Sequence, residues 1–76
     1  MRKPLDEEQA IMDTIAASHD VELADVLSRA RAPVLTIVRR AIALELHSRH
    51  YYTEAEIGAA LCRGRGGARY LLETAR

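Results

Sequence analysis

Apolar residues recur at helical spacing along most of this chain of 76 residues. The pattern predicts a first helix from Asp6 to about Ser18 and a short second helix over 20–27, each with one apolar stripe. The third predicted helix, 34–48, is apolar on nearly every side, which is typical of a central, buried helix. Pro33 precedes it, at a position where the missing N–H would be unpaired in any case.

The last third of the chain predicts a helix-turn-helix. Thr53 is followed three residues later by Glu56, which is the spacing of a capping box at a helix start. An apolar stripe follows, Cys-Arg-Gly at 62–64 interrupts it, and a second stripe resumes in a helix over 66–75. Two short helices joined by a tight, glycine-containing turn make a helix-turn-helix, here over about 53–75. The predicted fold class is therefore all-α, a small bundle of about five helices.

The composition agrees with a small helical domain. Alanine accounts for 13 residues and Phe and Trp are absent, so the core should be a thin one of Leu, Ile and Val. We expect one domain over 6–76 behind a flexible arm, 1–5. The single cysteine excludes an internal disulfide and fits a reducing compartment, and no stretch reaches the roughly 20 apolar residues of a membrane span. A soluble, cytoplasmic protein is expected.

The net charge is zero, but the two parts of the chain differ in sign. Residues 1–28 hold seven acids against two basic residues, a net charge of −5, and residues 29–76 hold nine arginines against four glutamates, a net charge of +5. The arginine-rich part points to a polyanionic partner, because arginine forms forked contacts with phosphates and guanine. The alternative is that two solvated faces attract each other within the monomer.

Most of the residues predicted to contact DNA belong to two basic segments. Arg65 would reach a phosphate or guanine at the start of the second helix of the motif, Arg69 a base edge or phosphate one turn later, and Arg63 the DNA backbone. Gly66 and Gly67 would let the protein backbone approach the duplex closely. The full predicted set is Arg29, Arg31, Arg39, Arg40, Thr53, Arg63, Arg65, Gly66, Gly67, Arg69 and Tyr70.

The sequence leaves alternatives open for several members of this set. Arg29 and Arg31, in a basic loop, could reach DNA or pair with the acidic first part of the chain. Arg39 and Arg40 could clamp phosphates or pair with glutamates, and both should reach the surface at one end of the third helix. Tyr70 could donate to a phosphate or pack in the core.

No catalytic or metal-binding constellation is legible in the sequence. His47 and His50 with Cys62 suggest a metal site, but structural zinc needs four ligands and the sequence offers no further cysteine pair or carboxylate cluster nearby. Cys62 has no base at a spacing that would activate it as a nucleophile. The glycines within 64–67 lack the preceding strand and the Lys-Ser/Thr ending of a phosphate-binding loop. We expect no metal, no cofactor and no enzymatic activity.

Three segments carry a resemblance to a known family. They are Leu-Ser-Arg at 27–29 followed by Arg31, Arg-Ala-Ile-Ala-Leu-Glu-Leu at 40–46, and Glu-Ile-Gly at 56–58. With these segments, roughly residues 9–76 resemble the C-terminal DNA-binding domain of the bacterial replication initiator DnaA. The resemblance implies a helix-turn-helix of the Trp-repressor-like class and a DNA-facing surface.

The family's base-reading motif is only partly present. That motif reads Gly-Gly-Arg-Asp-His-Thr-Thr-Val, and the matching segment here retains Gly64 and Arg65. Residues 66–68 are Gly-Gly-Ala where the family has Asp-His-Thr, the positions expected to touch base edges. In the basic loop, Arg31 is the nearest substitute for a minor-groove arginine. The resemblance thus implies the fold and a DNA-facing surface, and not the family's own target sequence.

Two hypotheses from different classes follow. The first is a small, stand-alone helix-turn-helix protein that binds double-stranded DNA, with a role in the control of transcription or replication and a phage or other mobile element as a plausible source. The second is a protein-interaction module that modulates a nucleic-acid enzyme through the acidic first two helices, which carry Asp13, Asp20, Glu22 and Asp25. The chain could act as a monomer, or as a homodimer that reads two half-sites.

Overall fold

The chain forms five helices in the computed structural model, which describes residues 6–75 apart from the side chains of Arg65 and Ala75. The helices are α1 (Asp6–Ser18), α2 (Leu23–Val26), α3 (Pro33–His50), α4 (Glu54–Ala60) and α5 (Arg65–Ala75). No strand occurs within this range, so the predicted all-α bundle of about five helices is confirmed. The predicted arm, 1–5, lies outside the described residues, as does Arg76.

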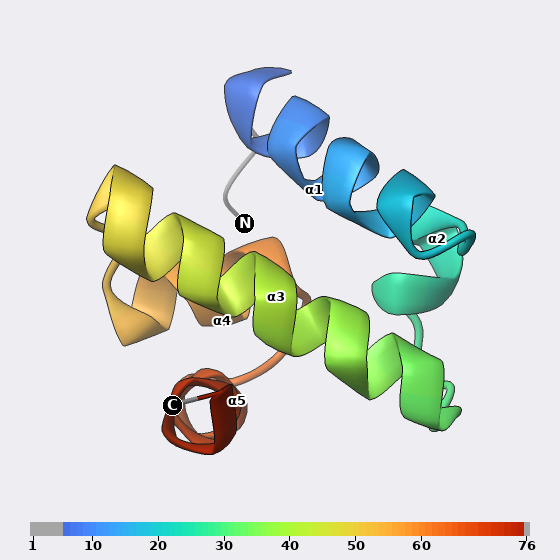
Figure 1. The fold of residues 1–76 in the computed structure, drawn as a ribbon. Helices are drawn as coiled ribbons and strands as arrows, with labels where there is room; N and C mark the ends of the chain where they lie inside the picture. Colours follow the sequence, from blue (N-terminus) through green and yellow to red (C-terminus); the bar gives the residue numbers. More distant parts are fainter. Residues whose placement is uncertain (1–5, 76) are drawn as a thin grey trace.

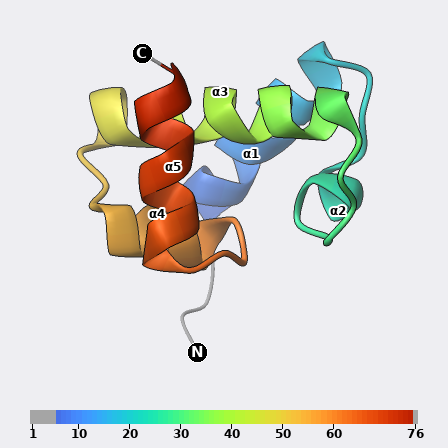
Figure 2. The same ribbon diagram turned by 90° about the horizontal axis from the view of Figure 1, so that it is seen from below.

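The long helix α3 packs against each of the other four helices. In Figure 1, α1 and α5 lie on opposite sides of α3, and α4 lies behind it. Figure 2 shows α5 crossing α3, with α2 near the start of α3 and α4 below its other half. The helix-turn-helix segment is therefore held in place mainly by α3.

The core is thin and rich in alanine and aliphatic residues, as the composition predicts. Its buried apolar residues are Met12, Ala16, Val26, Leu35, Val38, Ile42, Ala43, Leu46, Ile57, Ala60, Leu61, Ala68, Leu71 and Leu72. One acid is buried beside it: Glu8 is 2% exposed and accepts a hydrogen bond of 2.8 Å from the hydroxyl of Tyr52. This contact ties α1 to the segment between α3 and α4.

The prediction that α3 is buried on nearly every side is wrong. Val34, Ile37 and Leu44 are exposed on one side of the helix, and Ile37 is 51% exposed. These positions fall on one helical face, and the other four helices pack on the remaining faces. The helix is also longer than predicted: it starts at Pro33 and continues to His50.

The second helix begins later than predicted, at Leu23 instead of Asp20. Asp20 has a left-handed backbone, with φ of 57°, and belongs to the turn that ends α1. In this turn the N–H of Asp20 donates to the carbonyl of Ala17, and the N–H of Val21 donates to the carbonyl of Ala16, both at 3.1 Å. This is the Schellman pattern of helix termination, in which aspartate is one of the few tolerated residues besides glycine.

The predicted capping box at the start of α4 is confirmed. The hydroxyl of Thr53 accepts from the N–H of Glu56 at 3.2 Å, and the carboxylate of Glu56 accepts from the N–H of Thr53 at 2.9 Å. Two backbone N–H groups that lack helical partners are thereby satisfied.

Replacing the capping threonine should destabilise the domain. Thr53→Ala removes one acceptor for an end N–H of α4, so the free energy of unfolding should fall by about 1 kcal/mol. Urea denaturation followed by circular dichroism measures this loss. Thr53→Ser keeps the hydroxyl and is the matched control. An equal loss in both variants would mean that the methyl group, and not the cap, is responsible.

Candidate nucleic-acid interface

The predicted pair of helices, α4 and α5, is joined by a short turn at 61–64. α4 ends where the N–H of Arg63 donates to the carbonyl of Gly58 at 2.7 Å, and the N–H of Ala68 donates to the carbonyl of Gly64 at the start of α5. A Cβ added to Gly58 would lie 2.8 Å from the carbonyl oxygen of Arg63. Glycine is therefore needed at position 58 for α4 to pass this close to the turn.

The helix α5 has one face in the core and the other in solvent. Its buried residues are Ala68, Leu71 and Leu72. Its exposed residues are Gly66, Arg69, Tyr70, Glu73 and Thr74. Tyr70 lies on the surface, so packing in the core, one of the two alternatives that the sequence left open, does not occur.

Arg69 pairs with an acid on its own helix. Its Nε donates to Oε1 of Glu73 at 3.0 Å. The pKa of Arg69 is raised, first by this hydrogen bond, then by the charge of Glu73 and by that of Glu54. Both side chains are exposed to solvent, which screens their charges, so the pair can open at low cost. The spacing of four residues could have signalled this partner in the sequence.

A cavity of about 430 Å³ lies where the basic loop before α3 meets the α4–α5 turn. We call it the arginine cleft. Its lining residues are Arg29, Ala30, Arg31, Arg39, Cys62, Arg63 and Gly64. Four of the seven are arginines and none is an acid. Two segments more than 30 residues apart in the sequence thus form one cationic surface.

One backbone oxygen holds two of these arginines together. The carbonyl of Ser28 accepts from Nη2 of Arg39 at 2.9 Å and from Nη2 of Arg63 at 2.7 Å. The pKa of Arg39 is lowered, first by burial and then by the neighbouring charge of Arg63. The two guanidinium groups therefore repel each other, and a neutral carbonyl cannot cancel their charge.

Arg29 and Arg31 are exposed where they line the cleft. Neither makes a hydrogen bond or ion pair with another described residue. The alternative in which they pair with the acidic first part of the chain therefore does not form among the residues that the structure describes. Within the part of the chain that the structure describes, no side chain competes with a ligand for either guanidinium group.

The expectation that Arg39 reaches the surface is wrong, since only 6% of it is exposed. Its Nε donates to the carbonyl of Val26 at 2.7 Å, and its Nη2 contacts the carbonyl of Asp25 at 3.3 Å. The carbonyl of Val26 lies at the end of α2, and that of Asp25 also accepts from the N–H of Ser28 at 3.2 Å, so the charged side chain adds to the cap at the end of this helix. Arg40, the next residue, donates from Nε to the hydroxyl of Thr74 at 2.8 Å.

The remaining predicted residues are spread over the motif. Thr53 is held in the capping box. Gly67 packs beside Arg63, and a Cβ added to Gly67 would lie 3.4 Å from the Cβ of Arg63. The backbone of Arg65 opens α5, and its side chain is outside what the structure describes. The structure thus gathers four predicted arginines in the cleft and places Gly66, Arg69 and Tyr70 on the outer face of α5.

The two histidines considered as metal ligands have separate partners. Nδ1 of His47 lies 3.1 Å from the carbonyl oxygen of Tyr52, whereas His50 lies between Glu7 at 3.8 Å and Glu45 at 4.0 Å. Over residues 6–75, no group of three or more His, Cys, Asp or Glu side chains is placed to hold a metal ion.

Comparison with protein-family models, curated proteins and solved structures found no match to this chain. The resemblance to the DnaA domain therefore remains a prediction from the residues. Among the helices described, none is long and apolar enough to cross a membrane.

Proposed function

We propose that this protein is a small helix-turn-helix protein that binds double-stranded DNA and regulates transcription or replication. The observation that carries the proposal is the position of the arginine cleft, which lies beside the α4–α5 turn and so adjoins the start of α5. In helix-turn-helix proteins the start of the second helix enters the major groove, and flanking cations contact the phosphates. The cleft supplies such cations at the matching end of the helix.

In this proposal α5 contributes the groove contacts. Gly66 is exposed near its start, with nothing within 4 Å of an added Cβ, so a duplex can approach its backbone closely. Arg69 would exchange Glu73 for a phosphate or a guanine, and the hydroxyl of Tyr70 would donate to a phosphate. Few side chains can reach base edges, so we expect phosphate contacts to supply most of the affinity.

The salt dependence of binding to a random duplex pool tests the proposal. Fluorescence anisotropy with 20–30 base-pair duplexes should give binding at low salt, with log K falling against log salt at a slope of about −4 to −5 if four to six phosphates are contacted. Arg69→Gln should reduce that slope, whereas Arg49→Gln should not, because Arg49 lies in the last turn of α3, outside both α5 and the lining of the arginine cleft. Absence of binding at the lowest salt would reject the function.

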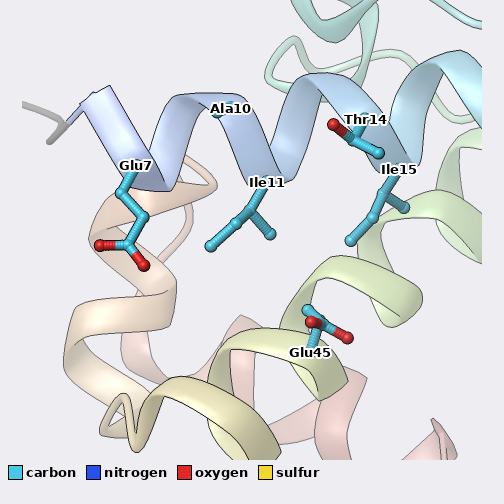
Figure 3. A pocket seen from close by; sticks show the side chains of 6 residues that line it. All are labelled: Glu7, Ala10, Ile11, Thr14, Ile15 and Glu45. Atoms are coloured by element: carbon cyan, nitrogen blue, oxygen red, sulfur yellow. The ribbon is translucent and has the colours of Figure 1, made fainter.

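A specific observation also favours the protein-interaction hypothesis. An open, largely apolar groove with a cavity of about 420 Å³ lies between α1 and α3, lined by Glu7, Ala10, Ile11, Thr14, Ile15 and Glu45. Figure 3 shows Ile11 and Ile15 pointing from α1 toward α3. The acids named for this hypothesis, Asp13, Asp20, Glu22 and Asp25, are exposed. Loss of all DNA binding in the anisotropy experiment would make this groove and these acids the leading candidate surface.

A further inference from the structure

We propose that the arginine cleft is a preformed pocket for one phosphate group, and that in the DNA complex it holds a single phosphate of the backbone beside the start of α5. The assignment to a DNA phosphate rests on the proposed function, whereas the presence of an anion pocket does not.

The first argument is uncompensated charge. Arg39 and Arg63 meet at the carbonyl of Ser28, where their Nη2 atoms lie 2.9 and 2.7 Å from one oxygen. Carbonyls are neutral acceptors, and no acid lines the cleft. The ion pairs that arginines form within the described residues involve Arg49 and Arg69, which lie elsewhere. An anion supplied from outside is therefore the group that would relieve the repulsion between the two guanidinium groups.

The second argument is that the pocket is already ordered. Arg39 is buried and fixed by the carbonyls of Asp25 and Val26, so its position costs no additional entropy when a ligand binds. Arg63 is fixed by the carbonyl oxygen of Ser28, to which Arg39 also donates. The two cations thus stay in place in the absence of any ligand.

The third argument concerns the chemistry of the remaining lining. Arg29 and Arg31 are exposed on the loop and have no described partner, so they are free to fold over an anion. Gly64 lines the cleft without a side chain, and nothing lies within 4 Å of its would-be Cβ. Guanidinium groups bind oxyanions through forked hydrogen bonds that chloride cannot accept in the same way, and a phosphate offers more acceptor oxygens to a cluster of four arginines than a carboxylate does.

The test uses inorganic phosphate as the probe. The protein is titrated with phosphate against chloride at constant ionic strength, while two-dimensional NMR follows the backbone amides of 28–31 and 62–64. We expect saturable shifts in both segments. Arg31→Gln and Arg63→Gln should each weaken phosphate binding about tenfold, the effect of losing one charge-assisted hydrogen bond. Arg31 supports no described contact, so its variant keeps the fold even if the Arg63 variant is destabilised.

The same variants are then measured with duplex DNA. Each should lower the affinity about tenfold and reduce the salt slope by about 0.9, which corresponds to one phosphate. Arg49→Gln, at an exposed arginine in the last turn of α3, should change neither binding equilibrium.

The possible outcomes distinguish a failure of the phosphate pocket from a failure of the proposed DNA-binding function. No phosphate-specific shift, together with salt-dependent DNA binding by the wild-type protein, overturns the pocket and leaves the function standing. Phosphate binding that both variants retain, or DNA affinity that neither changes, means an adventitious ion only and also overturns it. Absence of both kinds of binding rejects the pocket and the function together.

Discussion

Gly58→Ala is expected to lower the free energy of unfolding by about 3 kcal/mol, the upper part of the range for overpacked sites. The added methyl group would lie 2.8 Å from the carbonyl oxygen of Arg63 and 3.0 Å from that of Gly64. Both are backbone atoms, so relief requires the turn to move and the hydrogen bond from Arg63 to Gly58 to lengthen. In a domain of this size the melting temperature should fall by more than about 10 °C.

Gly66→Ala is the matched control. This glycine also lies in a helix, but nothing is within 4 Å of an added Cβ. Alanine there should stabilise the protein by about 0.5–1 kcal/mol, because it lowers the entropy of the unfolded chain. Thermal unfolding followed by circular dichroism gives the melting temperatures of both variants. Equal melting temperatures for the two variants would show that the turn does not constrain position 58.

Arg39→Ala is expected to cost about 2–4 kcal/mol of stability, because it leaves the buried carbonyl of Val26 without its donor and removes one of the two charged donors to the carbonyl of Ser28. The substitution removes the hydrogen bonds from Nε to the carbonyl of Val26 at 2.7 Å and from Nη2 to the carbonyl of Ser28 at 2.9 Å. Urea denaturation gives the total loss. Hydrogen exchange should show that the amides of Leu27 and Ser28 lose protection first, since they report on the turn that Arg39 holds.

Arg40→Ala provides the comparison for this variant. Its guanidinium donates to the hydroxyl of Thr74 at an exposed site, so the expected loss is at most about 1 kcal/mol. The two arginines are adjacent in the sequence but differ in burial and in the number of hydrogen bonds that their side chains donate. A similar loss in both variants would mean that the cap on α2 contributes little to stability.

The local features of the fold could be predicted because their causes lie within a few residues. The capping box of Thr53 and Glu56 and the helix start at Pro33 depend on neighbours in the sequence. The start of α2 could not be placed, because Asp20 was assigned a helical backbone when it adopts the left-handed one that ends α1. A hydrophobic pattern also does not say which faces other helices cover, and so the exposure of Ile37 was missed.

The arginine cleft shows a different limit. The sequence indicated that Arg29, Arg31, Arg39 and Arg63 were candidates, but not that they share one site. The atom that joins two of them is the backbone oxygen of Ser28, and every residue has such an oxygen. Arg63 is 35 residues away from it along the chain. The pattern of side chains in a sequence does not indicate a contact to a backbone oxygen, and this one forms only when α2 and α5 pack against α3.

Three of the helices end at a residue with a left-handed backbone conformation, and this affects which substitutions the chain can tolerate during evolution. Asp20, Tyr51 and Cys62 end α1, α3 and α4 with φ of 57°, 58° and 57°, and none of them is glycine. Each conformation costs a residue with a Cβ about 1 kcal/mol or more, a strain that glycine would not bear. Glycine at each position would remove this strain, and the larger backbone entropy that glycine loses on folding offsets part of the gain, which leaves a modest reserve of stability. That reserve would let the domain absorb destabilising changes elsewhere, such as new surface residues that alter what it recognises.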